Sequence, residues 1–345
     1  MINRDNWQAV KRFLAYRDRV MQNSRGTIGT YWQSLRHLLE WSDKNDFRKA
    51  PRIIPTFPEY MTTARTQRHP NENITDSLNP KYIGKVLSHA RIFFLWARVY
   101  EPGYPTAISE AWVQTLRPKR ALTGGATLQK REYWRLEDVE TIARFRPSTL
   151  VEQRTIAATC FLFLSGMRLG AFITLPFKAV DMQSRKVYQL PELGVKTKNT
   201  KAAITFLLPI PSLLSVVEEW HFLLSTQGIE HERFYWYANI ANSFARPIGQ
   251  FADAQELGKF VGKKRSLTVY QNDLKQLCEA AGVEYKSPHK LRHGHGVWGV
   301  KHAKNIAQLK AISQNLMHAN IGITDGIYGR LAEDDLEEII AGFGQ

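Results

Sequence analysis

The residues that could do chemistry lie in three short stretches of the second half of the chain. Arg168 stands in a Gly-bounded turn, His289 and Arg292 are three residues apart, and His318 precedes Tyr328 by ten residues. Residues three apart share one face of a helix, so His289 and Arg292 can address one small anion. Arginine binds two phosphate oxygens with its planar fork and keeps its charge at any relevant pH. The pattern therefore favours chemistry on a phosphate.

Cleavage of a phosphodiester without a metal requires three kinds of group. These are a nucleophile from the protein, cations for the charge of the transition state, and an acid for the leaving oxygen. Tyr328 suits the first role because a phenolate is both a good nucleophile and a good leaving group. A flexible basic turn between two predicted strands contains Lys196 and Lys198.

In their order along the chain, these motifs resemble the tyrosine recombinase, or phage integrase, family of site-specific DNA recombinases. The shared pattern is an arginine in a Gly-x-Arg turn, a lysine in a β-hairpin, His-x-x-Arg-His, Leu-x-His and a tyrosine. The resemblance covers essentially the whole chain, because the basic helical N-terminal part is similar to the core-DNA-binding domain of that family.

The resemblance implies a role for each catalytic candidate. Arg168 and Arg292 would clamp the scissile phosphate, and His318 would donate to a non-bridging oxygen. His289 would hydrogen-bond the phosphate and assist proton transfer at the attacking phenol. Lys196 would protonate the departing 5′ oxygen, and Lys198 in the same turn remains the alternative for this role.

The same resemblance implies an enzyme that acts on double-stranded DNA. Tyr328 would form a 3′-phosphotyrosyl intermediate, and strand exchange would pass through a Holliday junction in a tetramer on two recombination sites, with no cofactor. A mobile element is the expected source. A type IB-like topoisomerase and a non-catalytic DNA-binding factor on the same fold remain alternatives. The acidic, amphipathic segment 331–345 is expected to form a helix that packs on its own domain or docks on a neighbouring protomer.

The sequence departs from the family pattern at two positions. Ala171 stands where the family usually has an acidic residue, and Met317 replaces the usual glycine before the histidine. Neither change removes a catalytic group. His293 and His295 form a cluster with His289, but no carboxylate or cysteine lies nearby in sequence, so we expect no metal site and a supporting hydrogen bond from His293.

Charge independently points to a polyanionic partner. The 345 residues carry 47 Lys and Arg against 32 Asp and Glu, a formal net charge of +15. Residues 1–130 hold 21 basic and 10 acidic residues, a net of +11, which leaves +4 for residues 131–345. Such an excess draws in phosphate and releases its counterions, so we expect the first part to grip nucleic acid.

The basic residues that we expect to contact DNA lie in both parts of the chain. They are Arg25, Lys85, Arg117, Lys119, Arg120, Lys198, Lys263, Lys264 and Arg265. Taken alone, the run from Lys263 to Arg265 reads as a solvated loop.

The hydrophobic pattern predicts a mostly α (α+β) protein of two domains. Residues 1–116 form a helical core-DNA-binding (SAM-like) domain, 117–131 a basic linker rich in Gly and Pro, and 132–345 a mixed α/β catalytic domain with a small antiparallel sheet. The hairpin of that sheet is expected at 186–190 and 203–208. Among the helices we expect are 82–100, 170–175, 267–281, 289–300 and 306–317.

Other features exclude membrane and secreted classes. The stretch 155–164 is half a membrane span, and the N-terminus has no apolar segment of a signal peptide. Cys160 and Cys278 are expected to be buried free thiols. We therefore expect a cytoplasmic protein, associated with a bacterial or archaeal nucleoid.

Overall fold

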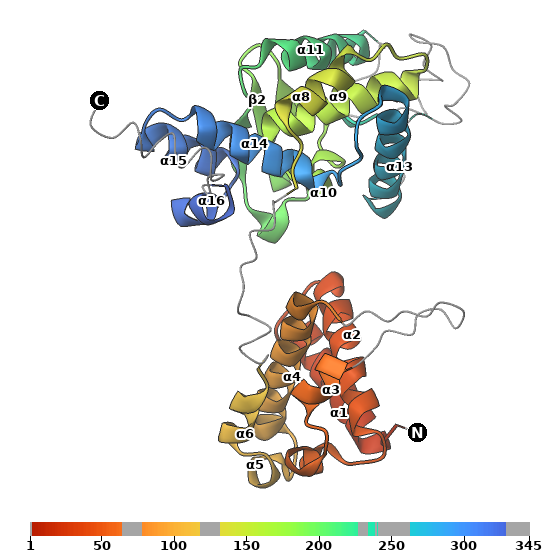
Figure 1. Ribbon diagram of the computed structural model, residues 1–345, viewed down its shortest axis with the longest axis vertical. Coiled ribbons are helices and arrows are strands. Elements are labelled where there is room, and N and C mark those ends of the chain that lie inside the picture. Colours follow the sequence, from red (N-terminus) through yellow and green to blue (C-terminus); the bar gives the residue numbers. More distant parts are fainter. Residues whose placement is uncertain are drawn as a thin grey trace. The chain divides into compact units, whose positions relative to one another are not determined.

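The structure, a computed structural model, describes residues 2–63, 78–117, 132–226, 234–238, 240 and 263–328. The chain divides into two compact units, Met1–Gln129 and Lys130–Gln345. Both are built mainly of helices, and the second also holds a small antiparallel sheet (Figure 1). The predicted fold class is therefore confirmed. No helix in these ranges is both long and apolar enough to cross a membrane.

The first unit is helical in its described residues. Its elements are α1 (Arg4–Arg19), α2 (Arg25–Ser42), η1 (Phe47–Arg52), α3 (Phe57–Thr63), α4 (Pro80–Tyr100), α5 (Tyr104–Ala107) and α6 (Glu110–Thr115). Helices α1, α2 and α4 pack on one another around edge-to-face aromatic rings, with Phe13 against Tyr31 and Phe93. The side chain of Ser24 caps α2 by accepting from the amide of Thr27.

The second unit carries all the predicted catalytic residues. Its helices are α8 (Leu136–Arg144), α9 (Leu150–Ser165), α10 (Leu169–Phe172), α11 (Pro211–Ser225), α13 (Lys263–Ala281), α14 (His289–His302), α15 (Ile306–Asn315) and α16 (Ile321–Tyr328). Its 3₁₀ turns and strands are η2 (Phe177–Ala179), β1 (Val180–Asp181), β2 (Lys186–Gln189), η3 (Pro191–Leu193), η4 (Lys198–Thr200) and β3 (Ala203–Phe206).

The sheet has the order β1-β2-β3, with both pairs antiparallel. In its register Lys186 lies opposite Phe206 and Gln189 opposite Ala203. The predicted hairpin is thus present, and β1 is an addition that two residues were too few to signal. The described part of the sheet ends at β3, whose outer edge faces away from β2.

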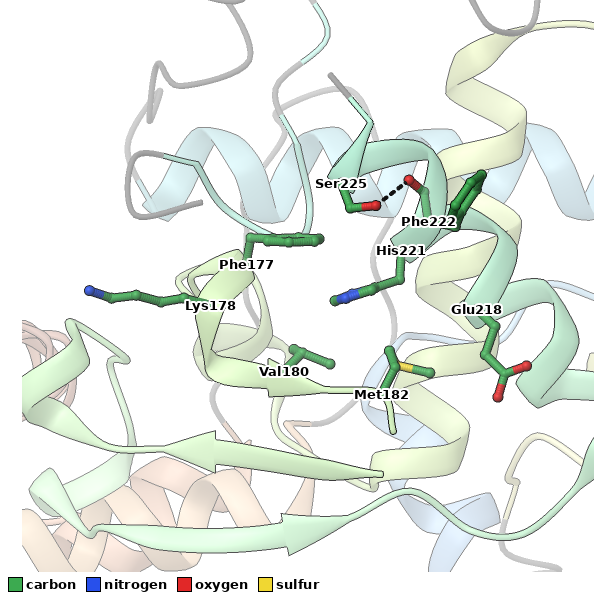
Figure 2. Close-up of a pocket in the computed structure, with 8 residues that line it drawn as sticks. All are labelled: Phe177, Lys178, Val180, Met182, Glu218, His221, Phe222 and Ser225. Carbon is green, nitrogen blue, oxygen red and sulfur yellow. Dashed lines mark hydrogen bonds between the residues drawn. The ribbon is translucent and has the colours of Figure 1, made fainter. Parts of the chain in front are cut away.

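A pocket of about 530 Å³ lies between η2, β1 and α11 (Figure 2). Val180 and Met182 line it from the sheet side and Glu218 from α11. The ring of His221 stacks on Phe177 at 4.3 Å. None of the six predicted catalytic residues lines this pocket.

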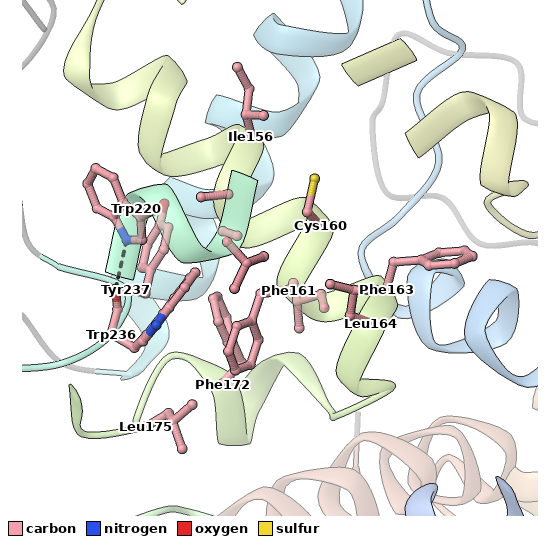
Figure 3. Packing of buried hydrophobic residues seen from close by; sticks show 14 of the residues in the cluster. Ile156, Cys160, Phe161, Phe163, Leu164, Phe172, Leu175, Trp220, Trp236 and Tyr237 are labelled. Carbon is pink, nitrogen blue, oxygen red and sulfur yellow. Dashed lines mark hydrogen bonds between the residues drawn. The ribbon is translucent and has the colours of Figure 1, made fainter. Parts of the chain in front are cut away.

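Helix α9 is the centre of the second unit. It packs against α8, α11, α13 and α14, and its residues are buried on nearly every face. Figure 3 shows Phe161 of α9 beside Phe172 and Trp236, with ring centroids 5.3 and 4.4 Å from Phe161. Because α9 is fixed from several sides, the turn that follows it is held rigidly. The thiol of Cys160 is buried in the same helix, as expected.

Three local predictions differ from the structure. Helix α10 is shorter than the expected 170–175, and α15 ends at Asn315 because Met317 adopts a left-handed φ of 53°. The loop expected at Lys263 to Arg265 is wrong, since these residues begin α13. Cations oppose the dipole at a helix start, so local sequence favoured a loop, whereas packing of α13 on α9 stabilises the helix.

Candidate active site

The first element of the site is the turn between α9 and α10. Gly166 ends α9 with a φ of 59°, and its amide donates to the carbonyl of Leu162 at 3.1 Å. A Cβ at this position would lie 2.7 Å from the ring of His295. Glycine is therefore required both for its conformation and for the close approach. The turn presents the half-buried Arg168 as the residue before α10.

Arg292 joins this turn to another one. It is 4% exposed on α14, and its Nη1 donates to the carbonyl of Gly166 at 2.7 Å. Its Nη2 donates to the carbonyl of Leu316, two residues before His318. The guanidinium thus lies between the turn that carries Arg168 and the turn that carries His318. Bonds to two backbone carbonyls fix its plane.

The charges of Arg168 and Arg292 reach both candidate histidines. Partial burial lowers the pKa of His289, and the positive charges of Arg292 and Arg168 lower it further. Burial likewise lowers the pKa of His318 to about 4, with the same two arginines adding to the effect. The geometry agrees with these shifts, because Arg292 contacts both the turn of Arg168 and the turn of His318, and His289 lies three residues before it on α14.

His289 and His318 differ in how they are held. His289 lies at the start of α14, where its residue is open to solvent but its ring is partly covered by neighbours and meets His293 edge-on at 4.9 Å. His318 is half-buried, and its Nδ1 lies 2.8 Å from the hydroxyl of the buried Thr324 on α16. This contact orients the His318 ring. No sequence pattern pointed to Thr324, because the contact depends on how α16 packs.

His295 does not converge with His289 on a common point. It is fully buried, its Nδ1 lies 2.8 Å from the carbonyl oxygen of Phe163, and burial lowers its pKa to about 4. Across the described ranges, no group of three or more His, Cys, Asp or Glu side chains is arranged to hold a metal ion.

Lys196 lies in the loop between β2 and β3. Its side chain is exposed, while the preceding Val195 is buried and anchors the loop. The amide of Lys196 donates to the hydroxyl of Thr174 at 2.9 Å, which brings its backbone next to the end of α10. Lys198 is exposed at the start of η4, on the same loop.

Tyr328 is the last residue of α16, which packs against α14 and α15. Its backbone therefore belongs to the same group of helices as Arg292 and the turn of His318. The side chain of Tyr328 and the segment 331–345 lie outside the described residues.

The residues expected to contact DNA are distributed over both units. Arg25 on α2, Lys85 on α4 and Arg117 after α6 are exposed, and Arg117 donates to the side chain of Gln114 at 2.7 Å. Lys119 and Arg120 lie outside the described residues, as do the side chains of Lys263, Lys264 and Arg265.

The sequence was compared with protein-family models and with curated proteins. The family model described as the phage integrase family matches residues 132–334. No curated protein matches the sequence.

Among the solved structures that share the fold are three integrase complexes with DNA. A lambda integrase dimer bound to a COC′ core site has a TM-score of 0.60 at 11% identity, covering 94% of this chain and 78% of that one. The Tn1549 transposon integrase in complex with circular intermediate DNA has a TM-score of 0.57 at 14% identity, covering 96% and 98%. A shorter lambda integrase dimer on the same kind of site gives 0.54 at 13%, also covering 96% and 98%.

Proposed function

Because this chain belongs to the phage integrase family, we propose that it is a site-specific DNA recombinase that cuts and rejoins DNA strands through Tyr328. The observation that carries the proposal is the pair of bonds from the buried Arg292 to the carbonyls of Gly166 and Leu316, which join the turn of Arg168 to the turn of His318. Two cations and two neutral imidazoles offer one phosphate several hydrogen-bond donors. The burial of Arg292 strengthens its attraction to an anion, since the local dielectric is low.

The histidines serve this reaction as neutral donors and acceptors. We assign His318 the tautomer in which Nδ1 accepts from Thr324, so that the ring carries its proton on Nε2 and hydrogen-bonds a non-bridging oxygen with it. His289, whose pKa is also lowered, accepts the phenolic proton when Tyr328 attacks. A phosphate bound in the site raises the pKa of both histidines, because its negative charge offsets the positive charges of the two arginines.

The cleavage step uses groups of the chain alone. The phenolate oxygen of Tyr328 bonds to phosphorus, the bond from phosphorus to the 5′ oxygen breaks, and Lys196 gives that oxygen a proton. The resulting 3′-phosphotyrosyl bond retains the energy of the phosphodiester. A 5′-hydroxyl from a second strand then attacks it and releases Tyr328.

We assign the division of labour along the chain in the same proposal. Residues 1–116 are the core-DNA-binding domain, 117–131 a basic linker, and 132–345 the catalytic domain with its C-terminal helix at 331–345. The net charge of +11 in residues 1–130 supports a grip on duplex DNA that does not depend on sequence. A tetramer on two sites, exchange through a Holliday junction, a mobile element as the source and a place in the nucleoid complete the proposal.

The test is covalent capture of DNA. The genome that encodes the chain is sheared, lightly nicked and incubated with the protein in EDTA. The mixture is denatured in detergent, and the DNA fragments that remain covalently attached to the protein are sequenced. Nicks trap the intermediate because the short leaving strand diffuses away. We expect an adduct at a defined sequence with the wild type and with Tyr188→Phe, a tyrosine control in β2, and none with Tyr328→Phe. No adduct from the wild type, or an adduct retained in Tyr328→Phe, would refute the proposal.

A further inference from the structure

Two polar side chains fasten the β2–β3 hairpin to the elements that carry the arginines and His318. We infer that Thr174 and Asn315 are positioning residues that hold Lys196 in place for its proton transfer. The inference rests on the proposed role of Lys196 as the acid for the 5′ oxygen. Neither residue belongs to the motifs that the sequence brought to attention.

Thr174 holds the loop itself. It follows α10 closely and is 1% exposed, and its hydroxyl lies 3.0 Å from the carbonyl oxygen of Ala171, to which it donates. The hydroxyl oxygen of Thr174 in turn accepts from the backbone amide of Lys196 at 2.9 Å. The hydroxyl therefore donates to a carbonyl of α10 and accepts from an amide of the Lys196 loop. A single buried atom thus ties the loop to the short helix that begins after Arg168.

Asn315 holds the strand that leads away from the loop. The amide of Phe206 donates to Oδ1 of Asn315 at 2.7 Å, and Nδ2 donates to the carbonyl of Phe206 at 2.9 Å. The same pattern of two hydrogen bonds, one in each direction, joins a hydrogen-bonded pair of residues in antiparallel strands. It occupies the outer edge of β3. Because the backbone supplies one donor and one acceptor, the orientation of the carboxamide is fixed.

A third contact connects Asn315 to the core. Its Nδ2 lies 3.4 Å from Nε2 of His295, whose Nδ1 meets the carbonyl of Phe163 at 2.8 Å. Since the carbonyl of Phe163 can only accept, Nδ1 carries the proton and Nε2 is the acceptor for Asn315. Asn315 ends α15, immediately before Leu316, whose carbonyl accepts from Arg292.

One contact acts at Lys196 and the other at the strand that follows it. Thr174 fixes the backbone of Lys196 relative to the turn of Arg168, and Asn315 fixes β3 relative to Arg292 on α14 and the turn of His318. The ammonium of Lys196 can reach the leaving oxygen only when the backbone of Lys196 lies within range, so displacing that backbone lowers the rate of proton transfer. A displacement near 1 Å can lower a rate by about 100-fold.

The experiment compares two leaving groups on the recombination site found by covalent capture. One nicked duplex has the natural 5′ oxygen at the scissile bond and the other has sulfur there, which leaves as a thiolate and needs no acid. Single-turnover cleavage is measured for Thr174→Val and Asn315→Leu, each with the same number and branching of side-chain heavy atoms as the original. Thr141→Val and Gln314→Leu are the matched controls, at exposed positions of α8 and α15. Thermal unfolding of each variant accompanies the rates.

We expect both variants to cleave the oxygen substrate about 10- to 100-fold more slowly, while the sulfur substrate is cleaved within about threefold of the wild-type rate. The controls should cleave both substrates as the wild type does. Thr174→Ser keeps the hydroxyl and should restore the rate on oxygen even if the valine variant folds poorly. Equal slowing on both substrates, or no slowing at all, would overturn the inference.

Lys196→Ala separates this inference from the function on which it rests. If sulfur rescues Lys196→Ala but not Thr174→Val or Asn315→Leu, the two residues do not position the lysine. If sulfur fails to rescue Lys196→Ala, or rescues Lys198→Ala instead, the proposed role of Lys196 is wrong.

Discussion

Replacement of Gly166 by alanine tests whether the turn after α9 is as tightly packed as the structure shows. Gly166 has a φ of 59°, where an L-residue is strained. An added Cβ would also lie 2.7 Å from His295 and 2.9 Å from a methyl group of Leu316. Neither neighbour can move cheaply, because His295 is fully buried and hydrogen-bonded and Leu316 is fully buried.

The expected loss has two parts that a matched control can separate. Gly282 also has a positive φ, of 67°, but a Cβ there meets nothing within 4 Å. Gly282→Ala should therefore lower the free energy of unfolding only by the conformational penalty, about 1–2 kcal/mol. Gly166→Ala adds the cost of overpacking, about 1–3 kcal/mol, so its total loss should be about 2–5 kcal/mol.

Both stability and activity are measured. Urea unfolding followed by tryptophan fluorescence gives the free energy of unfolding for each variant. The DNA cleavage rate should fall in Gly166→Ala even under conditions where the variant is folded, because the carbonyl of Gly166 orients Arg292. Gly282→Ala should cleave normally. Equal losses of stability in the two variants, or a normal cleavage rate in folded Gly166→Ala, would refute the account of this turn.

Three further predictions concern buried and strained groups. His295 is fully buried, and its pKa is about 4 in the folded protein against 6.5 when unfolded. Between these pH values it takes up a proton on unfolding, so the free energy of unfolding falls as the pH is lowered. The fall from pH 7.5 to 5.0, measured by urea unfolding, should be about 2 kcal/mol smaller in His295→Asn. Asp273→Asn should cost about 3–5 kcal/mol because it strands the buried Arg154, 2.7 Å away; a urea midpoint close to the wild type would contradict this. Met317→Gly should raise stability by about 1 kcal/mol by relieving its φ of 53°, with cleavage retained; a lower melting temperature would argue against strain there.

Sequence patterns predicted the elements that depend on neighbouring residues. The spacing of His289 and Arg292 indicated one helix, and both lie on α14. The glycine before Arg168 indicated a break in the helix, which the left-handed Gly166 provides. The alternating runs at 186–190 and 203–208 indicated a hairpin, and β2 and β3 pair there. Each signal reports backbone preferences within a few residues.

Patterns failed where long-range packing decided the outcome. The start of α13 at Lys263 opposes its local charge preference, and β1 is too short to show a period. Asn315 reads as a polar residue near the end of an apolar helix, yet it bonds to Phe206, 109 positions away. Its partner His295 reads as one of three clustered histidines, whereas it lies in the core.

The sequence by itself determined which reactive groups the chain has, their order, and the charge that favours a polyanion. Those properties belong to side-chain types and short spacings, which no fold can alter. The tertiary structure alone decided that Arg292 bonds to Gly166 across 126 positions and that Thr174 meets Lys196 across 22. Such bonds form only after the apolar faces of α9, α14 and the hairpin are buried together, because that burial provides the free energy that fixes distant backbone groups side by side.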